Sequence, residues 1–187
     1  MTRTRPDRGD LLVAGQILCG AGLLWPGRSR WAVPAVVRLG AVGAVAAGSM
    51  VALAGARWLG RELRSHPQPS AGAVLRTDGP YAAVRHPIYA GLLLGAGGMA
   101  LLRARREPLL AVAVLAGVLH VKARYEEGLL RARFGAAYDA YAAHVPRFVP
   151  KLTLQRRSGH WDLPNGAVAT GRNGEVSGDG HAGRASA

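Results

Sequence analysis

The sequence predicts an all-α, polytopic membrane protein with about four transmembrane helices and a cytoplasmic C-terminal segment. Four apolar runs, at residues 11–25, 39–56, 88–102 and 108–121, are separated by polar or Pro- and Gly-containing connections. Arginines flank these runs and form no stripe with interleaved aromatic residues, so the net charge of +13 does not indicate a nucleic-acid surface. An even number of crossings places both termini on one side. That side carries most of the Arg and Lys, which makes it cytoplasmic, although three arginines at 103–106 oppose this orientation.

The first run, residues 11–25, follows a basic start and ends at Pro26. A signal peptide has a similar pattern and stays an alternative, but no small-x-small cleavage site follows. Leu18 before Cys19 is also too large for a lipoprotein signal. Because Cys19 is the single cysteine of the chain, the sequence offers neither an internal disulfide nor a Cys-rich metal site.

The second run, residues 39–56, is uncharged and lies between Arg38 and Arg57, with Trp31 and Trp58 just outside. Its length is near the lower limit of about 17 residues for a membrane span, and Trp is typical of the membrane interface. We therefore predict a transmembrane helix here, followed by a polar connection that ends near Asp78.

The third and fourth runs predict a helical hairpin. Each is short enough to be a core helix of a soluble protein as well. Gly91 and Gly95 share one helical face, so we expect the two helices of the hairpin to pack closely against each other.

The stretch between the connection and the third run carries the most specific pattern. Gly79-Pro80 predicts a tight turn, and Pro87 suits the first turn of a helix. Arg85, His86 and Tyr89 then lie at the mouth of that helix, where the helix N-terminus and the cations favour an anion.

After residue 121 the helical pattern continues into charged sequence and ends near Gly135. We expect Glu127 to pair with Arg131 one turn later. Glu126 has no partner of that quality and could receive a ligand ammonium. An aromatic and proline-bearing segment at 138–150 is expected to fold back on the mouth, and the tail from 155 is expected to be disordered.

An anion site at His86 and a cation site at Glu126 suit a ligand that carries both an α-carboxylate and an α-ammonium. The ordered motifs identify a family. Gly79-Pro80-Tyr81, Arg85-His86-Pro87-Ile88-Tyr89-x-Gly91, Glu126-Glu127, Phe134-Gly135-x-x-Tyr138-x-x-Tyr141 and Val145-Pro146-Arg147 resemble the isoprenylcysteine carboxyl methyltransferase family, in a bacterial-type member. The related phospholipid N-methyltransferases share the glutamate pair, and the resemblance covers roughly residues 73–150.

The resemblance implies S-adenosylmethionine as cofactor and a lipophilic substrate. The cofactor-binding positions that it implies are Val74, Leu75, Tyr81, His86, Pro87, Ile88, Tyr89 and Glu126. Lys122 matches the residue that faces the substrate, with Arg85 and Glu127 as further substrate-binding candidates. Ala73 and Arg76 depart from the family pattern, which has a His and an apolar residue there.

We therefore expect transmembrane helices at 1–60, a catalytic methyltransferase region at 61–154 and the disordered tail at 155–187. The expected activity is carboxyl O-methylation in a bacterial cell membrane, with no metal and no nucleic-acid partner. Three alternatives stay open: a phospholipid or amine N-methyltransferase, an NADPH-dependent sterol-type membrane reductase, and a non-catalytic membrane scaffold. The oligomeric state and the methyl acceptor are not predicted.

Overall fold

A computed structural model describes residues 8–24, 31–60 and 74–151. The predicted disordered tail at 155–187 lies outside the described residues. Within the described ranges the regular structure is entirely helical, which confirms the all-α class. The elements are α1 (Arg8–Leu24), α2 (Ala35–Leu59), α3 (Pro80–Ala83), α4 (Pro87–Arg103), α5 (Arg106–Phe134) and α6 (Ala136–His144).

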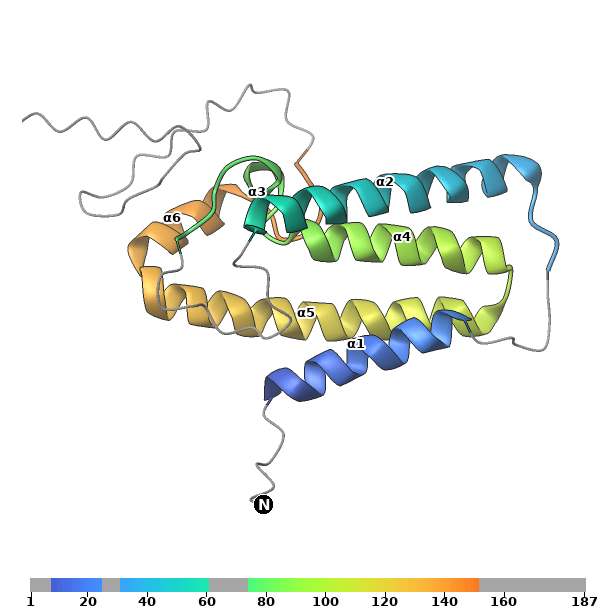
Figure 1. Cartoon of the computed structure of the whole chain (residues 1–187), viewed down its shortest axis with the longest axis horizontal. Coiled ribbons are helices and arrows are strands. Elements are labelled where there is room, and N and C mark those ends of the chain that lie inside the picture. The colour runs from blue at the N-terminus through green and yellow to red at the C-terminus, as the bar shows by residue number, and fades with distance from the viewer. Residues whose placement is uncertain (1–7, 25–30, 61–73, 152–187) are drawn as a thin grey trace, which may run out of the picture.

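The long helices α1, α2, α4 and α5 lie side by side and alternate in direction, as Figure 1 shows. The short helices α3 and α6 lie together at one end of this bundle. Among the described helices, α2 and α5 are long and apolar enough to cross a membrane, whereas α1 and α4 are shorter apolar helices. The alternation fits the predicted number of crossings, but only two of the helices meet the criteria for a span.

Local sequence signals set the helix boundaries as predicted. Gly79 has a positive φ of 55° and Pro80 opens α3. Pro87 opens α4, and Gly135, with φ of 53°, ends α5 and begins α6. A left-handed backbone costs glycine little, and proline loses no hydrogen bond in a first helical turn.

Small residues hold α2 and α4 at backbone contact. Ala41, Gly48 and Gly55 are the buried residues of α2, and their seven-residue spacing keeps them on one face. A Cβ atom on Gly48 would lie 2.5 Å from the backbone nitrogen of Gly95, and one on Gly98 would lie 2.6 Å from the carbonyl oxygen of Ala41. Neither position has room for a side chain.

This packing corrects one prediction. The Gly91–Gly95 face was expected to receive the other helix of the hairpin, α5, but Gly91 instead meets Gly48 and Ala52 of α2. The reason is the complementary surface: α2 presents small residues at matching intervals, whereas α5 presents Leu115 and Leu119 to the bundle.

The other side of the bundle is packed by larger side chains. Leu115 and Leu119 of α5 form a buried cluster with Cys19 of α1 and Ala96 of α4. Gly22 lets α1 approach α5, since a Cβ there would lie 3.2 Å from that of Ala111. By contrast, most of the apolar stretch of α2 is not buried, so its outer face presents apolar side chains to the surroundings. Such a continuous apolar face suits lipid.

Candidate active site

Chain segments far apart in sequence meet at the end of the bundle where α3 and α6 lie. The backbone nitrogens of Arg85 and His86 donate to the carbonyl oxygens of Pro146 and Arg147, at 2.8 and 3.1 Å. The Tyr141 hydroxyl donates to the carbonyl oxygen of Tyr81 at 2.7 Å. These bonds confirm that the segment after α5 folds back on the mouth of α4.

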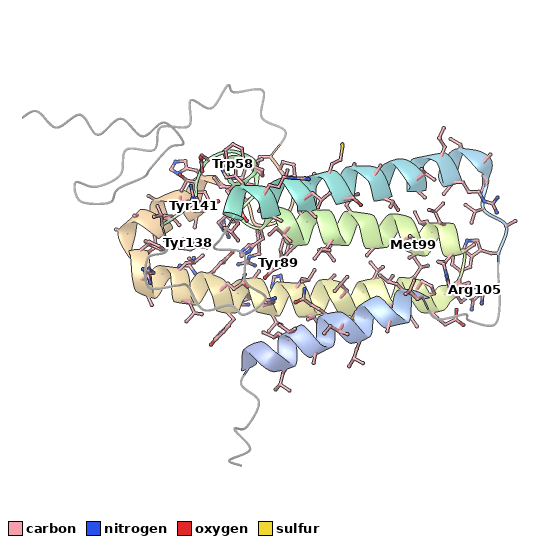
Figure 2. All side chains as sticks on the ribbon, in the orientation of Figure 1. Trp58, Tyr89, Met99, Arg105, Tyr138 and Tyr141 are labelled. Carbon is pink, nitrogen blue, oxygen red and sulfur yellow. The ribbon has the colours of Figure 1, made fainter. Side chains whose placement is uncertain are left out.

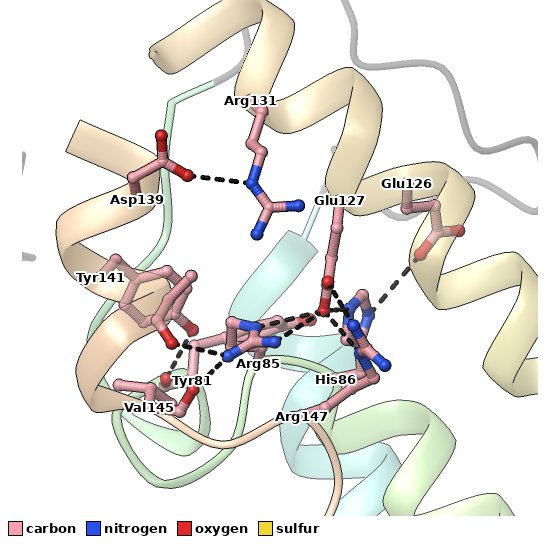
Figure 3. A network of polar contacts seen from close by, with 11 residues as sticks. Tyr81, Arg85, His86, Glu126, Glu127, Arg131, Asp139, Tyr141, Val145 and Arg147 are labelled. Atoms are coloured by element: carbon pink, nitrogen blue, oxygen red, sulfur yellow. Dashed lines mark hydrogen bonds and ion pairs between the residues drawn. The ribbon is translucent and has the colours of Figure 1, made fainter. Parts of the chain in front are cut away.

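Glu127 lies at the centre of a buried ionic cluster, shown in Figure 3. Its side chain is 1% exposed. Arg147 binds it with two nitrogens, Nε at 2.8 Å from Oε1 and Nη2 at 2.7 Å from Oε2. Arg85 donates to Oε1 from Nε at 3.2 Å and from Nη2 at 3.0 Å, and His86 Nε2 lies 3.3 Å from the same oxygen. The anion that the mouth was predicted to bind is therefore supplied by the chain itself.

The expected helical pair between Glu127 and Arg131 is wrong. Arg131 Nε binds Asp139 Oδ1 of α6 at 2.9 Å, on a surface where both side chains are about half exposed or more. Glu127 faces the interior, because only there does it meet the two arginines from the mouth and the returning segment.

Arg85 is held from several sides. Besides Glu127, its Nη1 donates to the carbonyl oxygens of Ala142, at 2.9 Å, and of Val145. These contacts tie the mouth of α4 to the end of α6. The hydrogen bond with Glu127 raises the pKa of Arg147, which stays charged. Burial raises the pKa of the neighbouring Tyr138 to about 12, so its hydroxyl stays neutral.

Glu126 lies next to this cluster in a more open environment. The Tyr89 hydroxyl donates to Glu126 Oε1 at 2.6 Å, and His86 Nδ1 lies 3.6 Å from Oε2. The His86 and Tyr89 rings are stacked with their centroids 5.3 Å apart. Glu126 was expected to have no comparable partner, and the structure corrects this: His86 bridges both carboxylates. The Glu126 side chain nevertheless stays 19% exposed.

Lys122 completes this second group. Its Nζ lies 5.4 Å from the centroid of the Tyr89 ring, which projects from α4 toward α5 in Figure 2. The same atom donates to Gln16 Oε1 of α1 at 2.8 Å. Lys122 is only 4% exposed, because α1 covers it. We refer to Tyr89, His86, Glu126, Lys122 and Gln16 as the open site.

The remaining predicted residues do not join the contacts of the open site. Leu75 packs against Tyr138, Tyr141 and Val145. The Tyr81 hydroxyl reaches toward the carbonyl oxygen of Gly55 at 3.5 Å. Pro87 and Ile88 pack on the same glycine of α2, and Val74 is half-buried in the connection.

Three participants were not assigned a role from the sequence. Arg147 belongs to the Val145-Pro146-Arg147 motif, but no neighbouring residue in the sequence indicates that it binds Glu127. Phe148 lies beside His86, with ring centroids 6.0 Å apart. Gln16 could have been found as the one amide in an apolar run, where polar groups are costly. Within the described ranges, no group of three or more His, Cys, Asp or Glu side chains is arranged to hold a metal ion.

The structure is thus an apolar helical bundle with a set of carboxylate, histidine and tyrosine side chains at one end, and two of its helices are long and apolar enough to cross a membrane. Comparison with known families makes this specific. Residues 37–137, more than half of the chain, match the phospholipid methyltransferase family, and the chain belongs to that family. This confirms the resemblance to the isoprenylcysteine and phospholipid methyltransferases.

Two relatives are similar over part of their length. The cobalt-zinc-cadmium resistance protein CzcN of Cupriavidus metallidurans is 30% identical over 143 residues, which is 74% of this chain and 59% of that protein. Methanethiol S-methyltransferase 2 of Bradyrhizobium diazoefficiens is 39% identical over 87 residues, which is 46% of this chain and 33% of that protein. The chain thus spans less than two thirds of either relative.

Proposed function

We propose that this protein transfers a methyl group from S-adenosylmethionine to a lipophilic acceptor, and that the acceptor atom is a carboxylate oxygen. The difference between the two glutamates carries the proposal. Glu127 is enclosed by two arginines and a histidine, whereas Glu126 is partly exposed and bound by a neutral hydroxyl and by His86. One carboxylate therefore holds the fold and the other is available to a ligand.

Glu126, His86 and Tyr89 of the open site fit the amino-acid end of the methyl donor. Glu126 would accept hydrogen bonds from the α-ammonium, and His86, whose ring nitrogens face Glu126 and Glu127, would keep Glu126 directed at the ligand. Tyr89 would hold Glu126 in place through its short hydrogen bond. Val74, Leu75, Tyr81, Pro87 and Ile88 are proposed to line the rest of the cofactor site, as the family resemblance implies.

Bound S-adenosylmethionine would supply an electrophilic methyl carbon. Transfer of this methyl group to the acceptor oxygen would leave the electron pair of the broken carbon–sulfur bond on the sulfur of the donor. A carboxylate is already ionised, so the step needs no base. The chain then contributes alignment and exclusion of water. Lys122 orients the acceptor anion, while Arg85 and Glu127, first considered as substrate contacts, shape the site through the ionic cluster.

A thiol acceptor is the second candidate. The similar protein from Bradyrhizobium is named for methanethiol, and a thiolate is an anion like a carboxylate. Lys122 beside the acceptor would favour the thiolate over the thiol. An ammonium acceptor, by contrast, would be repelled by Lys122 until it lost its proton.

We also propose that α1, α2, α4 and α5 all cross the membrane, with the site on the cytoplasmic side. A cysteine in place of exposed Ala143 should react with an impermeant thiol reagent only from the cytoplasm, and one in place of exposed Arg106 only from the outer side. Both variants carry Cys19→Ala. Labelling of the two positions from the same side would reject this topology.

The acceptor can be identified with three probes of equal chain length: decanoate, decanethiol and decylamine. Purified protein in lipid vesicles, given methyl-labelled donor, should methylate decanoate fastest, and the label should be released by base as expected for an ester. Lys122→Met should lower decanoate turnover more than tenfold while donor binding is retained. A base-stable product on decylamine would overturn the carboxylate assignment, and a product on decanethiol would select the second candidate.

A further inference from the structure

Helix α1 contributes a polar group to the open site, whose other members come from α5, from α4 and from the residue that precedes α4. The matching region begins at residue 37, so α1 lies outside it. Yet the one amide in the apolar run of α1, Gln16, faces the bundle and accepts a hydrogen bond from Lys122 Nζ at 2.8 Å. Its neighbours Ile17 and Leu18 are 67% and 72% exposed, so the amide is placed inward and the apolar side chains outward.

The docking of α1 makes this placement specific. Cys19 lies three residues after Gln16 on α1 and packs with Leu115 and Leu119 of α5. Gly15 and Gly22 bring the helix close to Val118 and Ala111 of the same partner. Gln16 is therefore fixed over Lys122 by packing on both sides of it along the helix.

The choice of a neutral group matters because Lys122 lies in a charged neighbourhood. Glu126, one turn later on α5, attracts the ammonium, and on α4 the ring of Tyr89 lies 5.4 Å from it. The amide oxygen of Gln16 binds the ammonium without neutralising its charge. An acidic residue in its place would pair with Lys122 and compete with an incoming anion.

We propose that Gln16 is a positioning residue that directs the Lys122 ammonium, with its charge intact, toward an anionic acceptor and thereby sets the preference of the enzyme for acceptor charge. This inference rests on the proposed function and extends it to α1. Gln16 does not touch the reacting atoms. It acts through Lys122.

The test measures how each Gln16 variant binds an anionic acceptor, decanoate, and a cationic inhibitor, decylammonium. Gln16→Glu should raise the KM for decanoate about tenfold or more, leave the Kd for S-adenosylmethionine unchanged, and strengthen inhibition by decylammonium. Gln16→Leu should raise the decanoate KM severalfold without strengthening that inhibition. The exchange Gln16→Ile with Ile17→Gln moves the amide to the outer face and should match Gln16→Leu, whereas Ile17→Ala should match wild type. A purely structural role would weaken decanoate and decylammonium binding alike.

The docking of α1 is checked separately from activity. With Cys19→Ala, the pair Gly22→Cys and Ala111→Cys should form a disulfide in membranes, because the two β-carbons would lie 3.2 Å apart and need only a small separation to reach disulfide geometry. This pair lies two turns away from Gln16. If the disulfide forms and the Gln16 variants keep wild-type acceptor selectivity, or if it does not form, the inference is overturned. If wild type binds no methyl donor, the proposed function fails first, and this role for Gln16 fails with it.

Discussion

Replacing Glu127 with glutamine should lower the thermal midpoint of the detergent-solubilised protein by about 10 °C. The substitution removes the charge that two arginines and a histidine share in a position 1% exposed. Leaving buried charges uncompensated costs about 3–5 kcal/mol, and for a chain of this size each kcal/mol shifts the midpoint by about 2–4 °C. Thermal unfolding followed by circular dichroism measures the shift.

Asp139→Asn is the matched control for Glu127→Gln. It also removes one carboxylate from an arginine pair, but Asp139 and Arg131 are 61% and 49% exposed. Exposed pairs contribute little because water and salt screen them. The midpoint should therefore hardly change. Equal midpoints for Glu127→Gln and Asp139→Asn would contradict the structural role assigned to the ionic cluster.

Glu126→Gln should weaken S-adenosylmethionine binding about a hundredfold while the protein stays folded. The variant keeps the shape of the side chain and an acceptor for the Tyr89 hydroxyl, but it loses the charge that would pair with the ligand ammonium. Loss of a charged partner in a partly buried pair, about 3 kcal/mol, corresponds to this factor. Isothermal titration calorimetry of wild type and variant measures it directly.

Tyr89→Phe separates the effect of the Glu126 charge from the effect of the hydrogen bond that holds this carboxylate in place. It removes the 2.6 Å hydrogen bond and keeps the ring stacked on His86, so the loss of affinity should be smaller, about tenfold. If folded Glu127→Gln binds the methyl donor more weakly than Glu126→Gln does, the roles of the two glutamates are reversed. If wild type does not bind it, the methyltransferase proposal is wrong.

The sequence predicted the features that depend on local backbone chemistry. Glycine and proline constrain the backbone at their own positions. They therefore predict the turn at Gly79, the helix start at Pro87 and the helix end at Gly135. The return of the aromatic and proline-bearing 138–150 segment to the mouth was also predicted.

The sequence did not predict which distant surfaces would meet. Gly91 permits close approach to any smooth helix, and only the spacing of small residues along α2 decides the partner. Glu127 has a suitable helical partner in Arg131, but burial with Arg85 and Arg147 satisfies more hydrogen bonds. The contact between Lys122 and Gln16, which are 106 residues apart, was not predicted either, because it depends on how α1 packs against α5.

The close contact of α2 with α4 has a mechanical consequence. Helices α2 and α4 form one closely packed pair, and α1 and α5 form a second pair. The two pairs are connected at the end far from the site by the short link at Ala104 and Arg105. A 17-residue helix such as α4 is about 25 Å long, so a rotation of ~5° at that link displaces the site end by ~2 Å. Tyr89 and His86 belong to the pair that contains α4, whereas Glu126 and Glu127 belong to the pair that contains α5. The polar contacts at the site end and the packing of Ala96 on Leu115 and Leu119 therefore fix the distance between the two glutamates and the residues of α4 that contact them.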